Sequence, residues 1–167
     1  MKGEYRTMEK VSDLIKNHHE IVLMSLWEEY FEEMLSGIKR YEYRKRYRKV
    51  PTKAFIYISK TKKSIGALIE FGQPIFGTAT EIAKLSESEQ AGTYKAMEEY
   101  LSGGKGIAIP IKAIYQFEPI HLDELKKEIP EFVAPQSYYL LDDKIKLLDL
   151  LKEKEIRTAH MITSCGK

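Results

Sequence analysis

The sequence contains little cysteine and histidine, and it lacks long apolar runs. Its one cysteine, Cys165, excludes a disulfide framework and is typical of a reducing compartment. The longest apolar runs, at 21–24 and 54–58, fall far below the ~20 residues that a membrane-spanning helix requires. Charges spread through the first twenty residues leave no apolar core for a secretory signal. We therefore expect a cytoplasmic protein that does not span a membrane.

Metal ligands and nucleophiles are equally scarce. Two of the four histidines, His18 and His19, are adjacent, whereas paired ligands on a helix stand four residues apart. His121 and His160 are isolated, and no serine lies in a Gly-x-Ser-x-Gly elbow. The glycines at 103–106 follow an expected helix, the reverse of a phosphate-binding loop. We expect no metal and no other cofactor.

Charge is distributed very unevenly along the chain. Residues 39–49 contain seven Lys or Arg residues and one acid, Glu42, which gives a formal charge of +6. The remaining chain, with 20 basic and 24 acidic residues, sums to −4. The total of +2 therefore hides a strongly polarised molecule, and the basic run is a candidate surface for an anionic partner.

The same run carries Tyr41, Tyr43 and Tyr47 between its charges. In an extended strand, alternation places Tyr41, Tyr43 and Lys45 on one face and four charged residues on the other, namely Arg40, Glu42, Arg44 and Arg46. Cations beside flat rings suit single-stranded nucleic acid or a nucleotide. The plainer interpretation is a solvated basic edge strand whose charges prevent aggregation while the tyrosines pack inward.

Hydrophobic periodicity predicts helices and strands in a mixed order. Apolar residues at helical spacing from Met8 to Ile15 indicate a short first helix. A buried strand at 21–26 then leads into a helix at 27–35, with Ser25 and Glu28 as its capping box and Gly37 as its stop. The further expected elements are the basic strand, strands at 53–59, 65–71 and 75–82, a helix opened by Ser86 and Glu89 and ending before Gly103, a strand at 107–117 with Pro110 at an edge or bulge, a helix at 122–128 and a terminal helix capped by Asp142. Successive short strands imply a curled sheet or small barrel.

This order, together with a Gly-x-Lys-x-x-Glu-x-Arg element, resembles the ASCH domain family. The resemblance rests on Leu23-Met24-Ser25-Leu26, the helix from Trp27 to Leu35, Gly37-Ile38-Lys39-Arg40-Tyr41-Glu42-Tyr43-Arg44, Ile56-Tyr57-Ile58-Ser59 and a closing segment from Ala134 to Leu140. It implies an α+β fold, a small PUA-like β-barrel with flanking helices. It also implies three parts: an N-terminal helical extension at 1–20, the ASCH domain at 21–141, and a C-terminal helix with a polar tail at 142–167.

The resemblance further implies a cleft beside the barrel that binds RNA or a nucleotide-like ligand. Lys39 would contact a phosphate, Arg44 would offer a planar fork, and Glu42 would hold Arg44 or accept from the exocyclic amine of a base. Four other residues are candidates for the same ligand: Arg46 through its charge, and Gln136, Ser137 and Tyr138 as a polar and aromatic cluster able to close over the cleft. The alternatives are that Glu42 and Arg44 form an ordinary surface ion pair and that the closing tyrosines only pack the end of the barrel.

Two other functions stay open. Some compact relatives are amidohydrolases on acylated cytidine that use a lysine, a threonine and a glutamate, and Lys39 matches the lysine while Glu42 stands at the threonine position. A carboxylate there stabilises the charged form of the lysine and opposes its use as a base or nucleophile, although Glu42 could itself serve as the acid or base. Alternatively, the helix at 142–153 presents its leucines to a partner protein or a second copy, unless these leucines cover the barrel. The sequence does not predict the oligomeric state.

Overall fold

The structure is a computed structural model that describes residues 9–16 and 19–162. Met8, His18 and Cys165, which the sequence analysis considered, lie outside the described residues. The elements in chain order are α1 (Val11–Leu14), β1 (Glu20–Trp27), α2 (Glu28–Leu35), β2 (Tyr41–Arg44), β3 (Thr52–Ser59), β4 (Ser64–Phe71), β5 (Ile75–Thr78), α3 (Ala79–Glu89), α4 (Tyr94–Leu101), β6 (Lys105–His121), α5 (Leu122–Glu128), β7 (Tyr138–Leu140), α6 (Ile145–Lys152) and β8 (Ile156–Met161).

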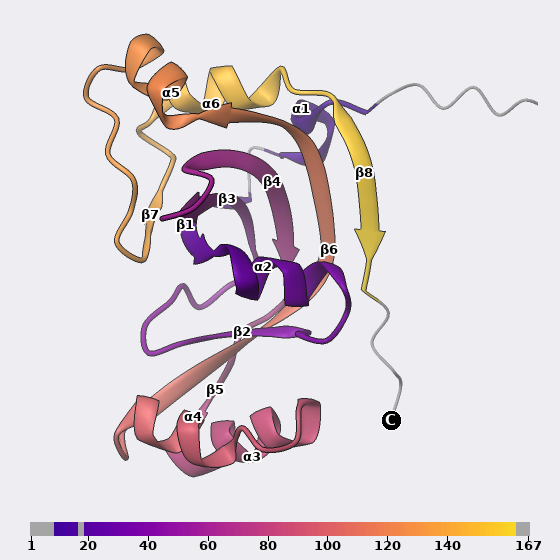
Figure 1. Ribbon diagram of the computed structural model, residues 1–167, viewed down its shortest axis with the longest axis vertical. Coiled ribbons are helices and arrows are strands. Elements are labelled where there is room, and N and C mark those ends of the chain that lie inside the picture. The colour runs from indigo at the N-terminus through magenta and orange to yellow at the C-terminus, as the bar shows by residue number, and fades with distance from the viewer. Residues whose placement is uncertain (1–8, 17–18, 163–167) are drawn as a thin grey trace, which may run out of the picture.

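Strand β6 organises the sheet. Its first part pairs with β2 and β5, and the part after Pro110 pairs with β4 and β8 (Figure 1). The sheet continues through β4, β3, β1 and β7, and the β1 and β3 pair is parallel while the other strand pairs are antiparallel. The curled sheet forms a half-barrel with helices at its flanks, so the α+β, PUA-like architecture expected from the sequence is confirmed.

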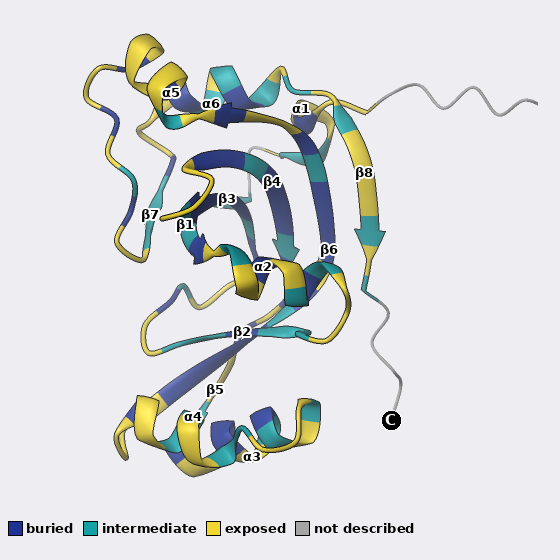
Figure 2. Ribbon diagram, viewed as in Figure 1, coloured by how far each residue is buried: buried dark blue, intermediate teal, exposed yellow. Residues whose placement is uncertain are grey.

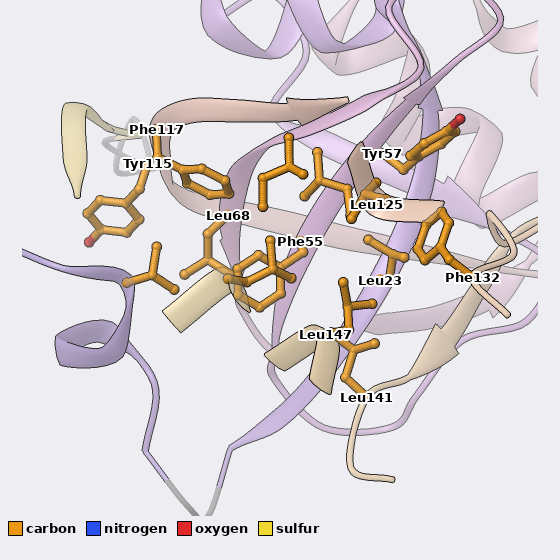
Figure 3. Packing of buried hydrophobic residues seen from close by; sticks show 14 of the residues in the cluster. Leu23, Phe55, Tyr57, Leu68, Tyr115, Phe117, Leu125, Phe132, Leu141 and Leu147 are labelled. Atoms are coloured by element: carbon orange, nitrogen blue, oxygen red, sulfur yellow. The ribbon is translucent and has the colours of Figure 1, made fainter. Parts of the chain in front are cut away.

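The central strands β1, β3 and β4 are buried on both faces because side chains from other elements cover both sides. Leu23 of β1 enters one core cluster with Phe55, Phe117 and Leu147, which Figure 3 shows from close by. Alternate residues of the same strand enter a second cluster, whose other members include Phe31 and Met34 of α2. A strand that is apolar on both faces shows no alternation, which is why residues 21–24 form a continuous apolar run.

Helix α6 belongs to this core. Leu147 and Leu151 are almost fully buried in the same cluster as Leu23 and Phe55. Helices α1, α5 and α6 lie together at one end of the molecule, as Figure 1 shows. These leucines therefore cover the barrel, the simpler of the two interpretations that the sequence allowed.

Two expected helix starts were wrong. Ser25 lies within β1 and donates its hydroxyl hydrogen to the Pro135 carbonyl oxygen at 2.5 Å, and the N-cap of α2 is Trp27. The second expected start, at Ser86, lies inside α3, because the strand expected at 75–82 ends at Thr78 and a reciprocal capping box between Thr78 and Glu81 starts the helix there. Both misplaced starts came from a Ser-x-x-Glu spacing that the tertiary structure uses in another way.

Further differences lie in the basic run and near the C-terminus. The basic strand is short, because β2 ends at Arg44 and the residues beyond form a loop. The N-cap of α6 is Lys144 and not Asp142. The stretch expected as a polar tail contains β8, an edge strand of the main sheet. Strand β8 is mostly exposed, so its residues do not alternate between apolar and polar in the way that predicts a half-buried strand.

No helix within residues 9–16 and 19–162 is long and apolar enough to cross a membrane.

Candidate functional site

A cleft of about 620 Å³ lies between α2 and the α3 and α4 hairpin, and β2 with the segment before it borders the cleft. In Figure 1 this hairpin lies at the opposite end of the molecule from α5 and α6, beyond the first part of β6. The cleft is lined on the α2 side by Trp27, Tyr30 and Glu33, along β2 and the segment before it by Lys39, Glu42, Tyr43 and Arg44, on the hairpin side by Ser86, Glu89, Met97 and Tyr100, and at the rim by Gln136. It therefore combines aromatic rings with groups of both charges.

Glu42 is the centre of an ion-pair network inside the cleft. Its carboxylate lies 3.4 Å from the Lys39 Nζ and 2.8 Å from a terminal nitrogen of Arg44. The Glu42 side chain is only 9 % exposed, and those of Lys39 and Arg44 are 14 % and 13 % exposed. An ordinary surface ion pair is thereby excluded, because a buried carboxylate depends on both of its cationic partners.

Arg44 holds several parts of the site together. Its Nε donates to Glu42 at 3.0 Å, one terminal nitrogen donates to the Ser137 hydroxyl at 2.9 Å, and the other donates to the Ser25 carbonyl at 3.2 Å. These bonds tie β2 to β1 and to the segment before β7. The guanidinium fork expected to receive a ligand is largely engaged within the protein, so Arg44 orients Glu42.

Lys39 is presented to the cleft between two aromatic rings. Its ammonium lies 4.9 Å from the Tyr43 ring centroid and 5.8 Å from that of Tyr30. The turn after α2 places it there: Gly37 takes the expected left-handed conformation, with a φ of +83°, and the Lys39 amide donates to the Glu33 carbonyl at 3.0 Å. An ammonium group has three donors, so Lys39 can contact Glu42 and an anionic ligand together.

Glu89 joins the α3 and α4 hairpin to β2. Its carboxylate accepts hydrogen bonds from the backbone amides of Arg40 and Tyr41 and from the Tyr43 hydroxyl. Burial raises the pKa of Tyr43 well above its usual value, and the Glu89 carboxylate raises that pKa further. Tyr43 therefore stays neutral and donates to Glu89 at neutral pH.

The other four candidate residues lie in different surroundings. Gln136 is exposed at the rim of the cleft, and Ser137 reaches the network through Arg44. Tyr138 instead packs edge to face on Tyr47 at 4.9 Å, as the barrel-packing alternative predicted. Arg46 is exposed in the loop after β2 and does not line the cleft.

Sequence reasoning missed several residues of the cleft. Trp27 and Tyr30 have the spacing of an apolar face in the helix expected at 27–35, yet they are 44 % and 42 % exposed. Glu89 was interpreted as a helix cap, and Tyr100 was not considered. The positions of Glu89 and Tyr100 in the cleft depend on how the α3 and α4 hairpin folds against β2, and no spacing in the sequence reveals that arrangement.

The described part of the chain contains no group of three or more His, Cys, Asp or Glu side chains that could hold a metal ion.

A family model described as the ASCH domain matches residues 24–134. A crystal structure of ASCH from Zymomonas mobilis has a TM-score of 0.65 and 25% sequence identity, covering 78% of this chain and 95% of that chain. A tyrosine-to-phenylalanine mutant of that protein has a TM-score of 0.68 and 23% identity, covering 81% of this chain and 99% of that chain. No curated protein sequence matches the chain.

Proposed function

The chain belongs to the ASCH domain family, and from that membership we propose that it binds RNA or a nucleotide-like ligand in the Lys39 cleft. The observation that carries the proposal is the buried network of Lys39, Glu42 and Arg44 lying among exposed aromatic rings. Nucleotides require a cation for the phosphate, a flat surface for the base and hydrogen-bonding groups for the edge of the base. The cleft offers all three within one hollow.

The charge of the network favours an anionic ligand. Two cations share one carboxylate, so the three side chains carry a net charge of +1. Lys39 can turn donors toward a phosphate without leaving Glu42, which keeps the buried carboxylate satisfied. The exposed cations Lys45, Arg46 and Lys49 follow directly after β2 and supply attraction that does not depend on sequence.

The affinity of a short single-stranded RNA, labelled and followed by fluorescence anisotropy, tests the proposal. We expect Lys39→Gln to weaken binding about tenfold, because it removes a charge-assisted contact. The matched control is Lys146→Gln, which removes the same charge from the exposed face of α6 at the other end of the molecule. Equal losses in both variants would contradict the cleft, and absence of RNA binding by the unmodified protein would contradict RNA as its ligand.

Hydrolysis of an acylated nucleoside is a second candidate. The observation that favours it is the position of Glu89, which lines the same cleft as Lys39 and gives that cleft a second carboxylate in addition to Glu42. Carboxylates near a reacting amide can act as general acid or base. Mass spectrometry after incubation with acylated nucleosides would detect turnover, and turnover that persists in Lys39→Ala would exclude this assignment.

A further inference from the structure

A row of two stacked rings between two ammonium groups leads out of the Lys39 cleft. From Lys39 the row passes to Tyr30 at 5.8 Å, and Tyr30 stacks on Trp27 with ring centroids 5.7 Å apart and planes 13° apart. Beyond Trp27, the Lys60 ammonium lies 3.9 Å from its ring centroid. The row thus connects the cleft to the turn between β3 and β4.

The rings of this row are accessible and aligned. Trp27 and Tyr30 each expose more than two fifths of their surface, although large aromatic side chains usually contribute to the core. Trp27 also lines a second hollow of about 460 Å³ that includes Ser59 and Lys60. Trp27 therefore borders both hollows. A ligand that extends from the Lys39 cleft into the second hollow passes over Trp27.

The turn beyond Trp27 is basic and strained. Lys60 and Lys63 adopt left-handed conformations with φ values of 69° and 46°, which cost energy for residues other than glycine. Lys62 pairs with Glu28 at 3.3 Å, so the Glu28 charge is compensated. Strained backbone conformations persist where the surrounding structure stabilises them. In this turn the left-handed conformation accompanies the position of Lys60 over the exposed Trp27 ring.

We propose that Trp27, Tyr30 and Lys60 form a second subsite that stacks the neighbouring nucleotide of a bound strand. The ligand is then a single-stranded polynucleotide and not a free mononucleotide, an inference that rests on the proposed function. A base that stacks on Trp27 displaces the Lys60 ammonium from the ring, and the ammonium pairs with the adjacent phosphate. Stacking platforms beside cations are a common means of holding single strands without reading their sequence.

Trp27 provides its own reporter, because it is the only tryptophan in the chain. Titration with a six-nucleotide single-stranded RNA should quench its emission at the concentrations at which anisotropy of the same labelled RNA shows binding. RNA that binds without changing the Trp27 emission would overturn the second subsite and leave the proposed function intact. Failure of RNA to bind at all would overturn the second subsite together with RNA as the ligand of the Lys39 cleft.

Substitutions test the energetic contribution of the platform. Trp27→Ala should weaken hexanucleotide binding about tenfold, and Trp27→Phe should restore most of the affinity because it keeps a ring. Lys60→Gly, which suits the left-handed backbone, should weaken binding several-fold and reduce its salt dependence. Affinity should rise with length from mononucleotide to hexanucleotide in the unmodified protein but not in Trp27→Ala. Equal length dependence in both proteins would overturn the proposal.

Discussion

The two halves of the basic run have different structural roles. Up to Arg44 the charged side chains lie in or beside β2 and are mostly buried in the network around Glu42. Beyond Arg44, the exposed cations Lys45, Arg46 and Lys49 lie in a loop that the buried ring of Tyr47 anchors to the barrel. Figure 2 shows the difference in burial between β2 and the loop that follows it. Charge held in a network shapes a site, whereas charge in an exposed loop attracts a ligand toward it.

Removing Glu42, the acid in the first half of the basic run, should have the largest effect on stability. Glu42→Gln leaves Lys39 and Arg44 without their buried carboxylate, so we expect the free energy of unfolding to fall by about 3 kcal/mol. Urea denaturation measures this loss. The matched control is Glu153→Gln, since Glu153 pairs with Lys10 on the exposed surface and should cost at most about 1 kcal/mol. Similar losses in the two variants would show that the network is no more than a surface pair.

The sequence predicted the first half of the run better than the elements around it. Glu42 and Arg44 lie together because residues two apart in a strand share a face, and the turn at Gly37 brings Lys39 beside Glu42. Trp27 and Glu89 escaped prediction because their positions depend on long-range packing. The apolar residues at 75–82 fit a strand as well as a helix start, and the Thr78 cap decided the outcome.

Weakening the contact between the α3 and α4 hairpin and the first half of the basic run should have an intermediate effect on stability. In Glu89→Gln a neutral amide replaces the carboxylate that accepts from two backbone amides and from Tyr43, so we expect a loss of about 2 kcal/mol. Native-state hydrogen exchange should show faster exchange at the Arg40 and Tyr41 amides, with little change in β3. Unchanged protection at these two amides would contradict the role of Glu89 as the link to β2.

The buried tyrosine of β2 should make stability depend on alkaline pH. The pKa of Tyr43 is raised in the folded protein, so above pH ~10 the unfolded chain loses a proton that the folded protein keeps. Its contribution is therefore complete below that pH and declines as pH rises. In Tyr43→Phe, which should cost about 1 kcal/mol at pH 8, the deficit relative to the unmodified protein should shrink between pH 10 and 11. Urea denaturation of both proteins at pH ~10 and pH ~11 measures this deficit. A deficit that stays constant would contradict a raised pKa of Tyr43 in the folded protein.

Changes in the second half should have the smallest effect on stability. Arg46→Gln removes an exposed charge, so the free energy of unfolding should stay within about 0.5 kcal/mol. RNA affinity should fall about twofold at low salt, and the difference should vanish at high salt because exposed charges are screened. A loss that persists at high salt would place Arg46 in the specific site with Lys39.

A crystal structure of the protein with a short single-stranded RNA tests the central claim most directly. The account predicts density for a nucleotide within hydrogen-bonding distance of the Lys39 Nζ, beside Tyr43, and a second base against Trp27. Density confined to the loop at 45–50, with the cleft around Glu42 empty, would contradict it.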